Sequence, residues 1–192
     1  MITSMSYKPF GDDVEIYVYE NFLTNYEIEY LNNYIKSKSE EGEGWEGELS
    51  STKDTKTWEN RNLFIEKNEV YDSIYNKFKE FYSENIFPIP LDSEVFSGLG
   101  PIARTQVGQG LALHDDMGPP ELQIDNLHGG IIYLNEDFTG GELYYKNFDY
   151  IIKPKSGMLV VHSAKNEYTH GVKEVSSGTR YAITLFIKNP SS

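Results

Sequence analysis

The histidines are the residues of this sequence with the widest chemical range, because a neutral imidazole is the commonest metal ligand in proteins. There are four of them: His114, His128, His162 and His170. Asp115 and Asp116 directly follow His114, and residues two apart on a strand point to the same face. His114 and Asp116 could therefore converge on one ion while Asp115 points away. A solvated loop explains the same triplet, since 30 of the 192 residues are acidic.

His170, 54 residues after Asp116, would complete a set of two histidines and one carboxylate. This set is the facial triad of non-haem iron(II) oxygenases, which leaves positions open for a co-substrate and oxygen. A zinc hydrolase could use the same three ligands, so the triad alone does not fix the chemistry. The sequence has no cysteine, which excludes thiolate catalysis, disulfides and cysteine-ligated zinc or iron–sulfur sites.

Arg180 follows the Ser176–Gly178 turn and opens an apolar stretch. If this turn closes a hairpin, Thr184 pairs roughly opposite His170. Arg180 and Thr184 then share a face with the end of the strand that carries the candidate metal ligand His170. A buried arginine needs an anion, and its planar fork suits a carboxylate. These parts fit a dicarboxylate held by Arg180 at one end and by the metal at the other. A structural salt bridge on an outer strand explains Arg180 equally well.

The first half of the chain, residues 1–97, mixes strand and helix patterns. A strand is predicted over Val14–Tyr19, and a helix begins at Thr24, which forms a capping box with Glu27. Ile28, Leu31 and Ile35 form the buried stripe of that helix. The acidic, glycine-rich residues 39–47 are predicted to be a loop. A second helix is predicted over residues 69–85, ended by two prolines.

The second half, residues 98–188, reads as eight short strands separated by turns rich in glycine, proline and serine. They span residues 101–105, 110–114, 130–134, 141–145, 150–153, 158–161, 171–175 and 181–187. This spacing favours a double-sheet jelly roll or a small barrel, with the two helices covering one sheet from outside. We therefore expect a mainly β, α+β chain forming one domain over residues 1–192, with a support region and possible lid at 1–97 and a jelly-roll core at 98–188.

The joint pattern resembles the Fe(II)/2-oxoglutarate-dependent dioxygenases of the prolyl 4-hydroxylase-like group. The matching segments, in order, are Tyr19–Thr24, Leu113–Asp116, Tyr133–Asn135, Gly140–Leu143, Lys153–Pro154 with Gly157, Thr169–Val172 and Arg180–Thr184. The resemblance covers most of the chain and is strongest from Arg104 to Lys188. It implies the double-stranded β-helix, which is a jelly roll and agrees with the predicted strands.

The resemblance also implies roles for individual residues. Three would bind the iron and form the catalytic centre: His114, Asp116 and His170. Arg180 would bind the distal carboxylate of 2-oxoglutarate, with Tyr133 and Thr184 as its hydrogen-bonding partners. The implied cofactors are Fe(II), 2-oxoglutarate and O2, with ascorbate. The implied reaction hydroxylates a substrate C–H and releases succinate and CO2.

The chain departs from the family pattern at two places. Many members carry a tyrosine near Arg104 or Thr105, so here Tyr133 works alone or Gln106 assists it. An aromatic residue often stands where this chain has His162, which is either a polar group behind or beside the iron or a histidine bonded to backbone.

Two other groups have weaker assignments. His128 is not expected to bind metal. Trp58–Arg61, within a segment spanning residues 39–66, is a candidate lid over the site, and a surface strand or core packing explains it equally well.

The substrate implied by the resemblance is a prolyl residue in a peptide or protein. A free amino acid or other small molecule is the alternative within the oxygenases, and a non-catalytic jelly-roll metal-binding module is the alternative class. The net charge of −13 disfavours nucleic acid and anionic membranes as partners. No apolar run is long enough to span a bilayer, so we expect a cytoplasmic protein. The sequence carries no sign of its oligomeric state.

Overall fold

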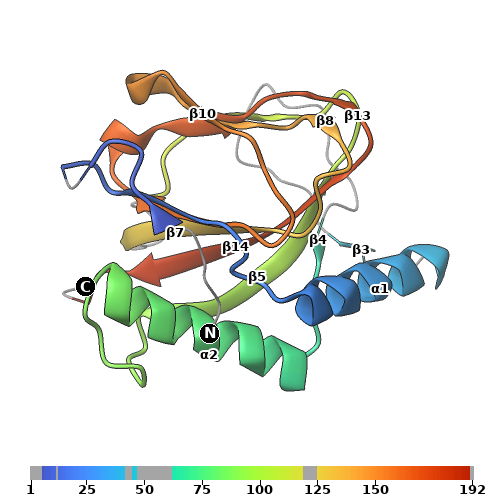
Figure 1. The fold of residues 1–192 in the computed structure, drawn as a ribbon, viewed down its shortest axis with the longest axis horizontal. Helices are drawn as coiled ribbons and strands as arrows, with labels where there is room; N and C mark the ends of the chain where they lie inside the picture. The colour runs from blue at the N-terminus through green and yellow to red at the C-terminus, as the bar shows by residue number, and fades with distance from the viewer. Residues whose placement is uncertain (1–5, 12, 42–44, 47–61, 119–124, 191–192) are drawn as a thin grey trace.

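The computed structural model describes residues 6–11, 13–41, 45–46, 62–118 and 125–190. Its strands form a sheet of eight, a sheet of four and a two-stranded ribbon. Figure 1 shows both helices on one side of the large sheet and the small sheet on its other side. This arrangement confirms the predicted double-stranded β-helix with helices packed on the outside of one sheet.

All strand pairs are antiparallel. The large sheet runs in the order β1 (Ser6–Tyr7), β2 (Ile16–Tyr19), β11 (Leu159–Ser163), β7 (Asn126–Tyr133), β14 (Arg180–Lys188), β5 (Phe96–Thr105), β4 (Asn62–Leu63) and β3 (Trp45–Glu46). The small sheet runs in the order β10 (Tyr150–Ile152), β9 (Leu143–Tyr145), β12 (His170–Val172) and β6 (Leu111–His114). The ribbon pairs β13 (Val175–Ser177) with β8 (Thr139–Gly140), and 3-10 turns cover Lys146–Phe148 and Asn166–Tyr168.

Two apolar clusters lie on the two faces of the large sheet. On β14, Ile183, Leu185 and Ile187 belong to the cluster under the helices, whereas Ala182 belongs to the cluster between the sheets. Side chains alternate between faces along a strand. Arg180 and Thr184 therefore project with Ala182 into the space between the two sheets.

Local sequence rules account for both helices. Helix α1 (Asn25–Glu41) begins at the predicted capping box, in which the Thr24 amide donates to Glu27 at 2.7 Å and the Glu27 amide donates to Thr24 Oγ1 at 3.2 Å. Helix α2 (Glu69–Asn85) has the predicted bounds, and the Asn68 side chain accepts hydrogen bonds from the amides of Val70 and Tyr71. Neither described helix is long and apolar enough to cross a membrane.

The predicted hairpin between His170 and Thr184 is wrong. His170 on β12 lies opposite His114 and Tyr145 in the small sheet, and Thr184 lies opposite Ile131 in the large sheet. The connecting strand β13 pairs with β8 instead. The chain here crosses from one sheet to the other, as a jelly roll requires, so β12 pairs with neither β13 nor β14.

Several element bounds also differ from the prediction. Strand β5 begins at Phe96, five residues early, and the predicted strand 171–175 is divided between β12 and β13. The loop predicted over residues 39–47 is wrong at its described positions: helix α1 continues through Glu41, because glutamate and serine tolerate a helix, and Trp45–Glu46 form strand β3. The lid candidate Trp58–Arg61 lies outside the described residues.

Glu27 of α1 connects the two helices through its side-chain contacts. It is buried, and it forms an ion pair with Lys77 of α2 in addition to the capping box. Burial alone would raise the pKa of Glu27. The hydrogen bond and positive charge of Lys77, together with the hydrogen bonds from Thr24, outweigh burial and lower the pKa below its usual value. The carboxylate therefore contributes stability above the pKa of the unfolded chain, and this contribution is lost as the pH falls through the lower folded value.

We predict that Glu27→Gln destabilises the protein at neutral pH while keeping the capping box. The expected loss is about 1.5–3 kcal/mol of unfolding free energy, the range for a hydrogen bond to a charged group. Urea unfolding should show the difference from the wild type above about pH 5 and a shrinking difference toward pH 3. Glu29→Gln, at an exposed position of the same helix, is the control. A pH-independent difference would contradict the assignment.

Candidate metal and co-substrate site

The three predicted metal ligands lie together. His114 ends β6, Asp116 follows two residues later, and His170 begins β12, directly opposite His114. One ligand atom from each of the three residues lies within 4.8 Å of the others. Asp115 takes no part in this cluster, and its carboxylate accepts a hydrogen bond from the Met117 amide at 3.2 Å.

Backbone carbonyls orient both imidazoles of the cluster. Nδ1 of His114 lies 2.9 Å from the Ala112 oxygen, and Nδ1 of His170 lies 3.0 Å from the Tyr168 oxygen. A carbonyl oxygen only accepts, so each Nδ1 carries the proton and each Nε2 keeps a lone pair for a cation. Burial lowers the pKa of His170 to about 3, so this ring is neutral at pH 7.

Asp116 supplies the negative charge of the cluster. Burial alone would raise the pKa of its carboxyl group, but the hydrogen bond from His162 and the nearby imidazoles outweigh burial and lower the pKa to about 2. The carboxylate is therefore ionised at neutral pH. Two imidazoles and one carboxylate form a donor set that fits a divalent cation such as Fe(II).

Asp116 has its place because Gly129 has no side chain. A Cβ atom at residue 129 would lie 1.9 Å from Oδ2 of Asp116 and 3.0 Å from Nε2 of His162. Sequence reasoning missed this role. A glycine within a predicted strand does not indicate which other segment packs against it, and here that segment is the loop after β6.

His162 bonds to the cluster rather than to backbone. Its side chain is fully buried on β11, with Nε2 3.0 Å from Oδ2 of Asp116 and Nδ1 2.6 Å from the Tyr145 hydroxyl. The sequence-based choice between a polar group near the iron and a backbone-bonded histidine is thereby resolved in favour of the first. Tyr145 was not singled out from the sequence.

Arg180 and Tyr133 form a second polar group between the sheets. Arg180 is 3% exposed, and its guanidinium carbon lies 5.0 Å from the centre of the Tyr133 ring. Arg180 Nε is buried and has no hydrogen-bond partner among the described residues, and the Tyr133 hydroxyl, also buried, has no partner there other than Arg180 itself. Unsatisfied buried polar groups are costly, so this pair fits a ligand that brings its own acceptor, such as a carboxylate.

The start of β14 is held on both sides of Arg180 by one side chain. Asn135 Nδ2 donates to the Thr179 carbonyl at 2.7 Å, and Asn135 Oδ1 accepts from the Tyr181 amide at 2.8 Å. Asn135 belongs to a segment that carries the family resemblance, but the sequence did not indicate this contact. The two bonds fix the backbone from which Arg180 projects.

The other residues considered in the sequence analysis lie at different places around the site. Thr184 shares the inner face of β14 with Arg180, and its part in co-substrate binding stays a prediction. Thr105, where many family members have tyrosine, is buried directly opposite Arg180, whereas Gln106 is exposed. His128 bonds to the Tyr82 hydroxyl of α2 at 2.8 Å and is not part of the metal cluster.

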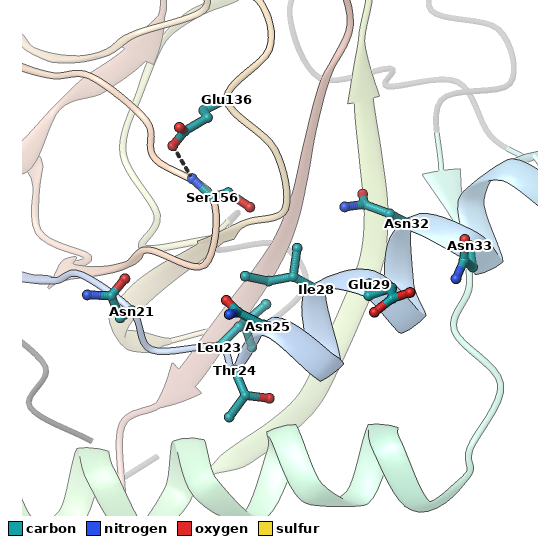
Figure 2. A pocket seen from close by; sticks show the side chains of 10 residues that line it. All are labelled: Asn21, Leu23, Thr24, Asn25, Ile28, Glu29, Asn32, Asn33, Glu136 and Ser156. Carbon is teal, nitrogen blue, oxygen red and sulfur yellow. Dashed lines mark hydrogen bonds between the residues drawn. The ribbon is translucent and has the colours of Figure 1, made fainter. Parts of the chain in front are cut away.

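A groove of about 830 Å³ lies elsewhere on the molecule, beside the start of α1 (Figure 2). It is lined mainly by polar residues: Asn21, Leu23, Thr24, Asn25, Ile28, Glu29, Asn32, Asn33, Glu136 and Ser156. Figure 2 also shows the hydrogen bond from the Ser156 amide to Glu136. None of these residues belongs to the metal cluster or to the Arg180–Tyr133 pair.

We predict that Gly129→Ala weakens binding of Co(II), a redox-stable probe of the cluster, by about 10- to 100-fold, because the added methyl group displaces Asp116. The matched control is Gly130→Ala, whose Cβ would make ordinary contacts of 3.4 Å with Leu185. Calorimetric titration of the metal-free proteins measures both. Equal affinities in the two variants would contradict the role of Gly129.

Comparisons with known proteins agree with this geometry. Residues 101–188 match the model of the 2OG-Fe(II) oxygenase superfamily. Human prolyl 3-hydroxylase 2 is 38% identical over 64 residues, a match that covers 31% of this chain and only 9% of that protein. The activity and substrates of that longer protein therefore do not transfer directly.

Solved structures extend the likeness to nearly the whole chain. A Pseudomonas putida prolyl-4-hydroxylase superposes with a TM-score of 0.68 at 15% identity, covering 92% of this chain and 93% of that one. A Trichoplax adhaerens prolyl hydroxylase in complex with a hypoxia inducible factor peptide fragment has a TM-score of 0.68 at 19% identity, covering 92% and 84%. The family match thus covers residues 101–188, which carry all the candidate site residues, and the solved structures extend the shared fold, though not a shared activity, to nearly the whole chain.

Proposed function

We propose that this chain is an Fe(II)- and 2-oxoglutarate-dependent hydroxylase of a prolyl residue in a peptide or protein. The observation that carries the proposal is the pairing of two incomplete sites within one interior. One is the His114, Asp116 and His170 cluster, and the other is the unsatisfied Arg180–Tyr133 pair. A non-catalytic metal module gives no reason for the second.

The two sites are connected through the inner cluster. Tyr133 and Tyr145 pack in the same apolar cluster between the sheets, and the Tyr145 hydroxyl bonds to His162 beside Asp116. An acid with a carboxylate at each end could therefore be held by Arg180 and Tyr133 while its other end reaches the metal cluster. This arrangement fits 2-oxoglutarate.

Each part of the chain has a distinct role in the proposed reaction. His114, Asp116 and His170 hold Fe(II), and Arg180 with Tyr133 orients 2-oxoglutarate and neutralises its distal charge. When bound, the iron supplies the oxidising chemistry: the substrate C–H, 2-oxoglutarate and O2 give the hydroxylated product, succinate and CO2. Ascorbate is the proposed reductant that keeps the iron as Fe(II).

The rim of the metal cluster supports an apolar substrate group. The His114 side chain is 29% exposed, so the cluster opens to solvent on one side. Met117, an apolar residue at 40% exposure, directly follows Asp116 in sequence. A prolyl ring suits such a rim, and the similar Trichoplax protein is described in complex with a peptide. The net charge of −13 favours neutral or basic peptides through electrostatic steering.

The test measures 2-oxoglutarate conversion to succinate with Fe(II), ascorbate and O2, with and without a panel of proline-containing peptides. We expect peptide-stimulated turnover and a 16 Da mass gain on proline, the mass of one oxygen atom. Turnover that no peptide stimulates would keep the oxygenase and reject the peptide in favour of a small molecule. No turnover and no 2-oxoglutarate binding would reject the enzyme.

We also predict that Arg180→Ala raises the KM for 2-oxoglutarate by about 10- to 100-fold, because about 1.5–3 kcal/mol of charge-assisted hydrogen bonding is lost. Its affinity for Co(II) should stay near that of the wild type. Arg104→Ala is the matched control, since Arg104 stacks on Trp45 at 4.3 Å on the outer face of the same sheet. An equal loss of metal and 2-oxoglutarate binding would contradict the assignment of Arg180.

A further inference from the structure

His162 stands at the centre of a hydrogen-bonded row that crosses the interior of the protein. The row runs from the Tyr145 hydroxyl on β9 of the small sheet, through both ring nitrogens of His162 on β11 of the large sheet, to Oδ2 of Asp116. Tyr145 and His162 are both completely buried. No other side chain in the described part of the chain bonds to the Asp116 carboxylate, apart from the contacts within the metal cluster.

The hydrogen bonds determine which atoms carry protons. The ionised Asp116 carboxylate only accepts, so His162 Nε2 donates to it. With this proton on Nε2, Nδ1 presents its lone pair to the Tyr145 hydroxyl, which donates to it. Each polar atom of the row therefore has a partner of the correct type.

The same ring also packs on a metal ligand. The centres of the His162 and His170 rings are 4.3 Å apart, and the centres of the Tyr145 and His170 rings are 5.7 Å apart. His162 thus contacts two of the three cluster residues without belonging to the group whose ligand atoms converge. Gly129 lies directly opposite His162 in the sheet and leaves the space in which Asp116 meets it.

We propose that His162, oriented by Tyr145, is a positioning residue that holds the Asp116 carboxylate in the orientation the metal requires. Its donated hydrogen bond occupies one acceptor position of Oδ2 and leaves the other lone pairs of the carboxylate for a cation. Residues that orient metal ligands in this way typically change metal affinity by about 10- to 100-fold when they are replaced. This inference rests on the metal role proposed above for Asp116.

The test compares two residues of nearly equal length at position 162, of which only one can donate. His162→Gln keeps a side-chain N–H for Asp116, and His162→Met does not. Co(II) titration of the metal-free proteins should show affinity about 10- to 100-fold weaker for His162→Met and a loss of about threefold or less for His162→Gln. Tyr145→Phe, which keeps the ring packing, should lie between them.

His128→Met is the matched control. It makes the same change at a second buried histidine of the large sheet, which bonds to Tyr82 and not to the cluster. Its Co(II) affinity should equal that of the wild type, even if its thermal midpoint falls. Thermal unfolding of each metal-free variant separates a loss of metal binding from a loss of folding.

The outcomes distinguish the possible failures. Equal loss in the Gln and Met variants would overturn the positioning role, because the donated hydrogen bond would then make no difference, and no loss in either variant would overturn it as well. A Tyr145→Phe variant with unchanged affinity would overturn the part assigned to Tyr145. If the wild type itself bound no Co(II), the proposed metal site and function would fail first.

Discussion

The burial of one carboxylate between two β-sheets is the constraint on which the site depends. An ionised carboxylate away from water is costly unless charges and hydrogen bonds compensate it. Within the protein, Asp116 has this compensation from the hydrogen bond of His162. A cation held by Asp116, His114 and His170 would supply the opposite charge, so the buried carboxylate and the two imidazoles form a compact, negatively charged set of ligands.

The two-sheet architecture supplies these groups from opposite sides. The small sheet brings His114 and His170 face to face through the pairing of β6 with β12. The large sheet contributes His162 from β11 and the open space at Gly129 on β7. Because β14 runs next to β7, the large sheet also places Arg180 beside Tyr133. The metal cluster and the Arg180–Tyr133 pair therefore both lie between the two sheets.

Local features of this protein were predictable from sequence, and contacts between the sheets were not. The capping box of Thr24 and the bounds of α2 follow from short-range rules. The ligand triad could be proposed from residue types and family spacing. The hairpin proposed to place Thr184 opposite His170 was wrong, because the chain changes sheets between β12 and β14.

The contacts that support the site could not be predicted from the sequence either, because they join residues that are distant along the chain. Tyr145 meets His162 only when the two sheets pack, and His162 meets Gly129 only when β11 pairs with β7. Asn135 and Thr179 likewise meet only when the end of β7 lies beside the start of β14. Such pairs depend on tertiary packing, which neither helical nor strand periodicity encodes.

Calorimetric titration of 2-oxoglutarate into the metal-free and the Co(II)-loaded protein would show whether the cluster and the Arg180–Tyr133 pair form one composite site. If one molecule bridges them, each binding event strengthens the other by the same factor. We expect one 2-oxoglutarate per chain and an affinity at least about tenfold higher with metal, a coupling of about 1.4 kcal/mol. Equal affinity in the two forms, or no binding to the Co(II)-loaded protein, would contradict a shared site.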